Sequence, residues 1–92
     1  HYAILNDANL NSADLSGANL TYSNLNSADL SDTNLFSADL SFADLENATM
    51  NGANLTGADL RGANLNGVIW NYTICPDGTN SDDNGNACEN NL

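Results

Sequence analysis

The chain has 92 residues and a mass of 9.6 kDa, which allows one small domain and no second core or separate catalytic lobe. Twelve acidic residues stand against one basic residue, Arg61, so the formal net charge is −11. This charge repels phosphate backbones and anionic membrane surfaces, which excludes ordinary nucleic-acid binding. No apolar run approaches the roughly 18 residues of a membrane span, which excludes membrane insertion. The sequence starts at His1 rather than Met, which predicts a trimmed or mature product.

A five-residue repeat runs along most of the chain. Residues 3–67 contain thirteen consecutive pentads of the form A-(N/D)-L-x-x, and a degenerate fourteenth pentad, 68–72, keeps the spacing without the polar residue. The repeat predicts a domain over 1–72, followed by a tail over 73–92 that is rich in Asp, Asn and Gly. The predicted core consists of the residues in the leucine position: Leu10, Leu15, Leu20, Leu25, Leu30, Leu35, Leu40, Leu45, Met50, Leu55 and Leu60.

A period of five fits neither an α-helix nor a free-standing strand. The other positions hold Asn, Asp, Ser, Thr and Gly, which are poor in helix interiors and common in turns. Within each A-(N/D)-L triplet, strand alternation sends Ala and Leu to one side and the polar residue to the other. The pattern therefore predicts an all-β solenoid whose coils bury their apolar side chains only through stacking.

These tandem A(D/N)Lxx pentads resemble the signature of the pentapeptide-repeat proteins, and the resemblance covers about three quarters of the chain. It implies a right-handed, four-sided parallel β-helix with four pentads per coil, here a little over three coils. It also implies that residues twenty apart stack on the outer surface. Tyr22 and Phe42 then form an aromatic pair, with Arg61 on the same face and Phe36 on the preceding one. Exposed aromatics beside Arg are typical of a partner-binding surface, although aromatics also stack for stability on any β surface.

The same register stacks Asp39 on Asp59 beside Arg61. A catalytic carboxylate pair is the alternative to an ordinary repeat position, and the repeat position is favoured because no histidine or cleft is implied nearby. The chain lacks a Ser/His/Asp set, a phosphate-binding Gly-rich loop and a histidine-containing metal cluster, so we expect no enzyme and no cofactor.

The tail contains both cysteines, Cys75 and Cys88, separated by Pro-Asp-Gly and Asn-Gly turn signals. This arrangement predicts a disulfide, and so a periplasmic, luminal or secreted protein. A metal site lacks further ligands, and a nucleophilic cysteine would require a basic neighbourhood that this acidic tail does not offer. Val68, Trp70 and Ile74 precede the bridge and are predicted to cover the C-terminal end of the core. At the other end, either Tyr2 and Ile4 fold over the core or that end abuts another chain, which leaves an end-to-end homodimer open.

A calcium loop is the remaining motif. Asn80, Asp82 and Asn84, followed by Gly85, have the spacing of oxygen ligands in such loops. The motif departs from the pattern at position 1, which is Asn, and at position 12, where Asn91 replaces Glu. The alternative is a solvated, turn-rich loop that the disulfide holds.

Four functional hypotheses follow. The first is a rigid, acidic module outside the cytoplasm that binds another protein. The second comes from the resemblance: some family members mimic DNA and inhibit or protect gyrase, which suits the charge but not a disulfide-containing chain. The third is a calcium-binding tail. The fourth is a segment of a longer repeat protein or an idealised consensus sequence.

Overall fold

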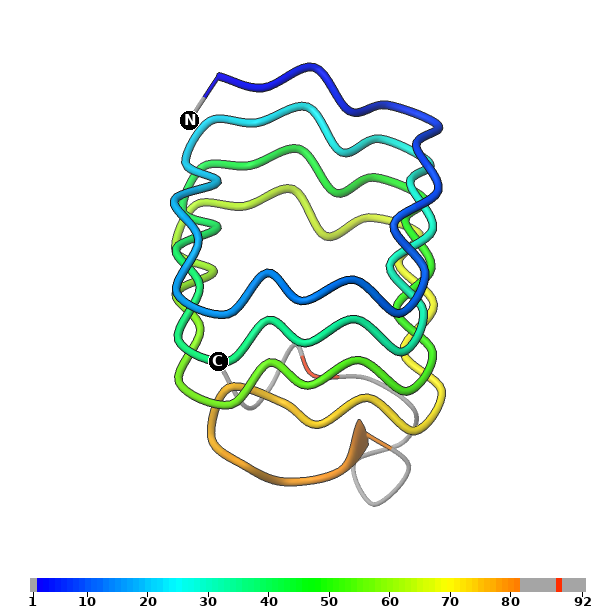
Figure 1. Cartoon of the computed structure of the whole chain (residues 1–92), viewed down its shortest axis with the longest axis vertical. Helices are drawn as coiled ribbons and strands as arrows, with labels where there is room; N and C mark the ends of the chain where they lie inside the picture. Colours follow the sequence, from blue (N-terminus) through cyan, green and yellow to red (C-terminus); the bar gives the residue numbers. More distant parts are fainter. Residues whose placement is uncertain (1, 82–87, 89–92) are drawn as a thin grey trace.

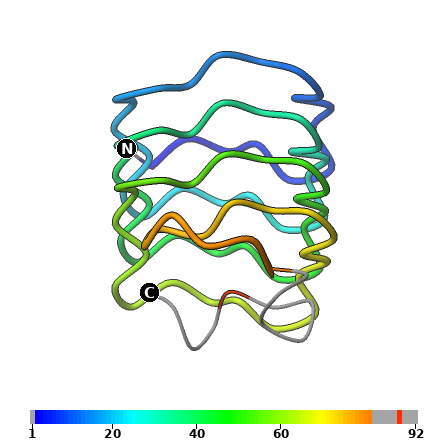
Figure 2. The same ribbon diagram turned by 90° about the horizontal axis from the view of Figure 1, so that it is seen from below.

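The computed structural model describes residues 2–81 and 88. The chain winds into a four-sided solenoid of stacked coils (Figure 1), with overall dimensions of 32 × 22 × 20 Å. Parallel β-bridges join residues twenty positions apart, such as Asn19 with Asp39 and Asp39 with Asp59. They recur every five residues, so one coil takes four pentads. Figure 2 shows the same stack of coils turned by 90°.

The β-structure consists of isolated bridges rather than extended strands throughout the described residues. Each bridge uses two backbone hydrogen bonds. Leu25 N donates to Asp44 O at 2.8 Å, and Asp44 N donates back to Ser23 O at 2.9 Å. The all-β class is therefore confirmed, with pairing confined to the middle residue of each pentad because the chain turns immediately afterwards.

Every corner is a tight turn closed by a hydrogen bond from the small residue of one pentad to the preceding leucine carbonyl, as from Ala43 N to Leu40 O at 3.0 Å. The second turn residue has a positive φ, near +60° in Phe42 and Asn47. Glycine adopts this conformation without a Cβ penalty, whereas other L-residues do so at a cost. This explains why Gly recurs at that position, at Gly52, Gly57 and Gly62 among others.

The polar middle residue of each pentad has a structural role. Its side-chain oxygen accepts a hydrogen bond from the backbone N–H two residues later, for example from Ser41 N to Asp39 Oδ1 at 3.0 Å. This is an Asx turn, which Asn and Asp form more strongly than Ser or Thr form the equivalent turn. The middle residues that form it are Asn9, Asp14, Asn19, Asn24, Asp29, Asn34, Asp39, Asp44, Asn54, Asp59 and Asn64.

The core is a column of leucines that is continuous along the axis. From Leu25 to Leu55 the residues in the leucine position, Met50 included, are fully buried. Leu20 and Leu60 are also buried, as predicted, whereas Leu10 and Leu15 are only half-buried. The residues predicted for the core therefore do point inward, but those of the first coil are less completely buried than the others.

The two ends of the column differ. At the N-terminal end, neither expected side chain covers the core: Ile4 occupies an outward position and is 81% exposed, and Tyr2 lies at a corner and is 67% exposed. At the C-terminal end, the repeat register continues through 73–77, because Ile74 bridges Asn54 and Cys75 fills the leucine position. The pairing then reverses, as Ile74 forms an antiparallel bridge with Asn80.

No helix in the part of the chain that the structure describes has the length and apolarity that crossing a membrane requires.

Candidate functional site

Three aromatic rings stack along one corner of the solenoid. Tyr2 and Tyr22 have ring centroids 5.4 Å apart and nearly parallel planes, at 12°. Tyr22 and Phe42 are 5.0 Å apart, with planes at 10°. All three occupy the second turn position, whose positive φ directs successive side chains along the same corner. The stacking of Tyr22 on Phe42 agrees with the twenty-residue register, and Tyr2 extends it by one ring.

The stack ends on a glycine. A Cβ at Gly62 would lie 2.5 Å from Cδ1 of Phe42, so the Phe42 ring rests directly on the Gly62 backbone. Tyr22 and Phe42 are about half exposed, at 53% and 54%. Since Gly62 covers one face of the Phe42 ring and the inner ring faces cover one another, Tyr22 and Phe42 present mainly their ring edges to solvent. Such an edge suits contact with apolar side chains better than stacking against a flat ligand.

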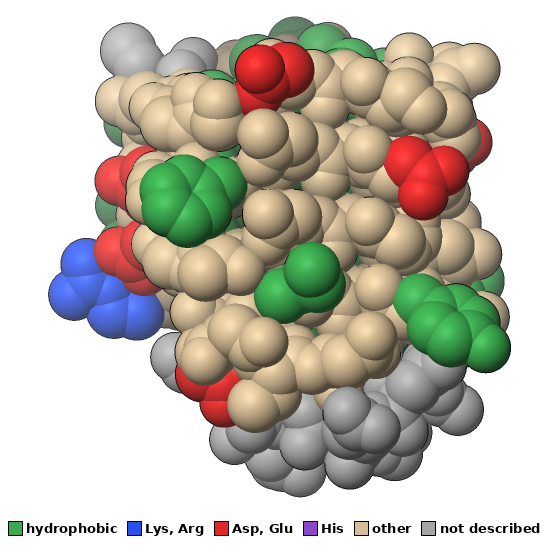
Figure 3. All heavy atoms as spheres, turned by 60° about the horizontal axis from the view of Figure 1, so that its bottom comes forward, with side chains coloured by type: hydrophobic (Ala, Val, Ile, Leu, Met, Phe, Trp, Pro, Cys, Tyr) green, Lys and Arg blue, Asp and Glu red, His purple; other side chains and the backbone are tan. Residues whose placement is uncertain are grey.

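Arg61 lies beside this stack and is held by Asp59. Its Nε donates to both carboxylate oxygens at 3.0 Å, and its Nη2 lies 2.6 Å from Oδ2. Hydrogen bonding from Arg61 lowers the pKa of Asp59, and the same contact raises the pKa of Arg61. Asp39 stacks on Asp59 as expected and adds a smaller electrostatic contribution to Arg61. Arg61, the only Lys or Arg residue of the sequence, is therefore paired with an acid, and Figure 3 shows it against red carboxylates at the edge of one face.

Asp39 and Asp59 each form the Asx turn of their pentad, with Ser41 N and Arg61 N as donors. Asp39 also accepts from Ser41 Oγ at 2.6 Å. Both carboxylates therefore accept the hydrogen bonds that stabilise their turns, which agrees with an ordinary repeat position rather than a catalytic pair.

A hollow of about 490 Å³ lies next to Arg61, lined by residues 58–63 and 65. Its lining combines Leu60, which is 4% exposed, with the charged pair of Asp59 and Arg61. The face that contains 58–62 is the one whose next coil is not completed as a pentad, because the chain folds back after Ile74. Sequence reasoning missed this hollow. The number of pentads could have located it, because the four faces do not receive equal numbers of pentads and this face has one fewer than the others.

Other exposed apolar side chains are scattered. Phe36, Ile69 and Tyr72 are each about half or more exposed and lie at other positions of the coil. Figure 3 shows apolar side chains on one face as separate spots surrounded by backbone and by side chains of other types. Phe36 ends the preceding face and does not join the ring stack, which consists of Tyr2, Tyr22 and Phe42 within the described residues.

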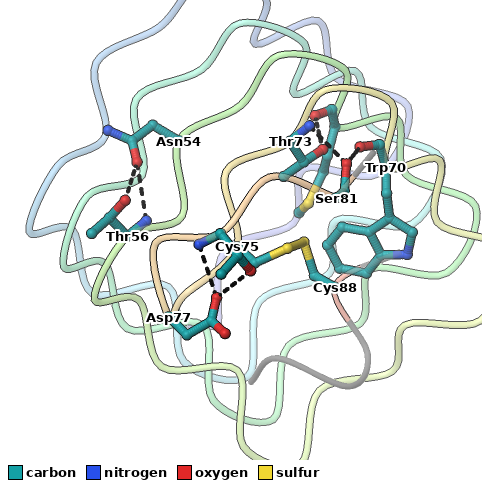
Figure 4. Close-up of a disulfide and its surroundings, with 10 residues drawn as sticks. Asn54, Thr56, Trp70, Thr73, Cys75, Asp77, Ser81 and Cys88 are labelled. Atoms are coloured by element: carbon teal, nitrogen blue, oxygen red, sulfur yellow. Dashed lines mark hydrogen bonds between the residues drawn. A yellow bond between two sulfur atoms is a disulfide. The ribbon is translucent and has the colours of Figure 1, made fainter. Parts of the chain in front are cut away.

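The closed end is built around the disulfide between Cys75 and Cys88, both fully buried (Figure 4). Trp70 fills the leucine position above it and is 3% exposed. Val68 packs against the core, whereas Ile74 occupies the outward position and does not belong to the cap as predicted. Ser81 joins the cap to the last coil, since its hydroxyl accepts from Thr73 N at 3.0 Å and donates to Trp70 O.

Of the predicted calcium ligands, Asn80 is described and takes part in the antiparallel bridge with Ile74. Asp82 and Asn84 lie outside the described residues. Across residues 2–81 and Cys88, no group of three or more His, Cys, Asp or Glu side chains is arranged to hold a metal ion.

Comparison with known proteins finds the same five-residue repeat. The family model for pentapeptide repeats matches residues 1–32 and 33–69. Among solved structures, HetL, a pentapeptide repeat protein involved in heterocyst differentiation regulation in the cyanobacterium Nostoc, is 38% identical, with 86% of this chain covered and a TM-score of 0.54. QnrB1, a plasmid-mediated fluoroquinolone resistance protein, is 25% identical over 78% of this chain, with a TM-score of 0.52.

The chain spans 41% of HetL and 43% of QnrB1. A second pentapeptide repeat protein from Nostoc is 44% identical over 75% of this chain and 61% of its own, with a TM-score of 0.46. No protein of curated function matches the sequence significantly.

Proposed function

Because the chain belongs to the pentapeptide repeat family, we propose that it is a non-enzymatic interaction module that binds another protein at its aromatic corner. The corner comprises the stack of Tyr2, Tyr22 and Phe42 together with the hollow beside Arg61. The coil is taken to be right-handed, the hand that the family implies. The observation that carries the proposal is the exposed stack, which ends beside a hollow whose lining includes a charge pair.

The arrangement has the features of a small protein-binding surface. Interface anchors are commonly aromatic, and a partner side chain gains most where it enters a pocket that excludes water. The ring edges offer an apolar strip, and the hollow offers a site for one apolar side chain next to a hydrogen-bonding pair. The net charge of −11 around this site favours a partner with a basic surface.

The test requires variants that remove rings without disturbing the fold. Tyr22→Gly and Phe42→Gly meet this requirement, because both positions have a positive φ that glycine adopts readily. Tyr72→Gly is the matched control, since Tyr72 is 69% exposed and has a φ of 54° at a different corner.

The partner is first identified by affinity capture and mass spectrometry, and its dissociation constant is then measured for each purified variant. We expect the Tyr22→Gly/Phe42→Gly double variant to bind at least about tenfold more weakly, as is typical of lost aromatic anchors. Binding by the Tyr72→Gly control should be unchanged. Equal affinities of the double variant and the unmodified chain would contradict the proposal.

We also propose that the protein works outside the cytoplasm. A disulfide that joins two fully buried cysteines supports this, because such bonds persist in oxidising compartments. A reduction potential below about −300 mV would agree with a structural disulfide. Two free thiols in freshly isolated protein would contradict it.

A second candidate is mimicry of DNA towards a cationic protein groove. One observation favours it: acidic side chains such as Asp7, Asp14, Asp32 and Asp39 belong to all four faces, while the only Lys or Arg side chain is paired with Asp59. Inhibition of supercoiling by purified gyrase at low salt is the assay. No inhibition at protein concentrations in the micromolar range would exclude this candidate.

A further inference from the structure

Asparagine is followed by glycine at two corners of the described solenoid, in Asn51–Gly52 and Asn66–Gly67. Both pairs occupy the two turn positions of their pentad, and both glycines have a φ of +73°. The hydrogen bond that closes the turn is present in both, at 3.0 Å from Ala53 N and 3.3 Å from Val68 N. The two pairs are therefore alike in sequence and in local backbone conformation.

An Asn-Gly pair is chemically reactive. The backbone nitrogen of the glycine, once it has lost its proton to water, attacks Cγ of the asparagine side chain. A bond forms between these two atoms, the bond from Cγ to Nδ2 breaks, and ammonia leaves with a proton taken from solvent. Water then opens the five-membered succinimide at either carbonyl, which leaves aspartate or isoaspartate and restores the glycine N–H. Glycine favours the reaction because it has no Cβ to obstruct its nitrogen.

The stacked coils hold the equivalent nitrogen at most corners. From Tyr2 to Gly57, the backbone N–H of the second turn residue donates to the carbonyl oxygen nineteen residues later. Gly52 follows this rule, since its N–H donates to Asn71 O at 2.9 Å. A nitrogen held by such a hydrogen bond must give up the bond before it can lose its proton and move towards Cγ of the preceding residue.

Gly67 lacks this hydrogen bond. Its N–H donates to none of the residues that the structure describes, because the repeat ends before it supplies the equivalent carbonyl. The turn is nevertheless fixed from the preceding coil, since Asn66 O accepts from Asn47 N at 2.9 Å. An ordered Asn-Gly turn thus presents an unpaired glycine nitrogen within the described part of the chain.

The two asparagine side chains also differ. Asn51 is partly buried, and its Oδ1 is shielded from solvent and has no hydrogen-bond partner. Attack on Cγ would convert this oxygen into an oxyanion, which is costly where neither water nor a donor reaches it. Asn66 is exposed, so water can solvate the developing charge. Both differences favour reaction at Asn66 over reaction at Asn51.

We propose that Asn66 is a site of non-enzymatic deamidation, with water as the reactant, whereas Asn51 in the same chain is protected. The products place a new carboxylate at the corner where Glu46 holds the equivalent position one coil earlier. Like charges on neighbouring strands repel, so the modification weakens this corner. Isoaspartate adds a further distortion, because it inserts a methylene into the backbone of the turn. The inference is independent of the aromatic-corner function.

The experiment follows both sites in one sample. The folded, disulfide-bonded chain is incubated at mildly alkaline pH and then digested with trypsin, which cleaves only after Arg61. Peptide 1–61 contains Asn51, and peptide 62–92 contains Asn66. Fragment spectra assign each conversion of amide to acid to its residue, which separates Asn66 from Asn84, outside the described residues. Methylation by purified protein isoaspartyl methyltransferase measures the isoaspartate product.

In the folded chain we expect Asn66 to deamidate at least about fivefold faster than Asn51, the ratio that one hydrogen bond of typical net strength gives. The matched control is the same chain reduced and unfolded in urea, where both sites should react at similar rates because no coil holds either nitrogen. Asn66→Gln should abolish the reaction at residue 66 and leave Asn51 unchanged, since glutamine would have to close a larger ring. Hydrogen exchange of the unmodified chain should show Gly52 N–H protected and Gly67 N–H unprotected.

Equal rates at the two sites in the folded chain, or faster reaction at Asn51, would overturn the proposal. So would a folded chain in which neither site reacts although both react in urea, because the Gly67 nitrogen would then be held as well. A fivefold difference that persists in urea would also contradict it, since the flanking residues rather than the coil would then set the two rates.

Discussion

The two ends of this solenoid show how a repeat protein closes its core. At the C-terminal end, Trp70 and Cys75 fill leucine positions, and Cys75 forms a disulfide with Cys88. A hydrogen bond from Thr73 N to Ser81 Oγ joins the cap to the last coil. At the N-terminal end the leucines are half-buried and Ser23 Oγ has no acceptor. The repeat alone cannot end a solenoid, since every coil needs a neighbour on both sides. Closure requires residues that depart from the repeat.

The largest expected difference between the middle and the open end comes from truncating leucines. Leu40→Ala removes a fully buried side chain and should cost about 2–5 kcal/mol of unfolding free energy. Leu10→Ala, in the half-buried first coil, should cost about 1 kcal/mol, because less area is lost from the core. Urea denaturation of both variants measures the contrast, and equal losses would show that the first coil is as well packed as the middle.

The disulfide tests the closed end. Replacing both Cys75 and Cys88 by Ser should lower the unfolding free energy by about 3 kcal/mol, because the bridge closes a loop across a separation of 13 residues. Thermal melts with and without reductant measure the effect on the unmodified chain, and the Ser variant should be insensitive to reductant. An unchanged melting temperature after full reduction would show that the contacts of Trp70 and Ser81, rather than the disulfide, stabilise this end.

Two glycines give a smaller and more local comparison. Gly17 and Gly62 have nearly the same φ, +68° and +72°, but a Cβ at Gly17 meets nothing within 4 Å whereas one at Gly62 meets the Phe42 ring. Gly17→Ala should therefore cost about 1 kcal/mol of backbone strain, and Gly62→Ala about 2 kcal/mol because the ring must also move. Denaturation midpoints measure both, and the near-ultraviolet circular dichroism of the stack should change only in Gly62→Ala.

The smallest effect concerns acid pH. Hydrogen bonding from Arg61 lowers the pKa of Asp59 below 3.8, so the stability from this pair is present above the unfolded-state value and is lost as pH falls through the lowered folded-state value. Asp59→Asn keeps the side-chain oxygen of the Asx turn and removes the charge. The difference in melting temperature between the two proteins should be small at pH 6 and should disappear near pH 2. A difference that persists at pH 2 would point to the amide itself rather than the lost ion pair.

Much of this molecule follows from its sequence, for a physical reason. A repeat fixes one local geometry many times over, so the inward leucines and the stacking of Tyr22 on Phe42 could be predicted by counting residues. The left-handed turn residue was not predicted, because Ser, Asp, Tyr and Phe occupy it as well as Gly. The hollow beside Arg61 and the outward position of Ile74 also escaped prediction, since both depend on where the chain leaves the repeat.

One residue in each pentad has the backbone conformation that a mirror-image amino acid prefers. Tyr22, Ser27, Phe42 and Asn47 all have φ near +60°, which is costly for an L-residue and favourable for its D-enantiomer. A chain of 92 residues is within reach of chemical synthesis by fragment ligation. D-residues at the corners whose side chains make no ring contact, Ser27 and Asn47, should then relieve this backbone strain. The backbone of each coil thus has the conformation that L-residues prefer along the faces, and the left-handed conformation at the second turn residue of each corner.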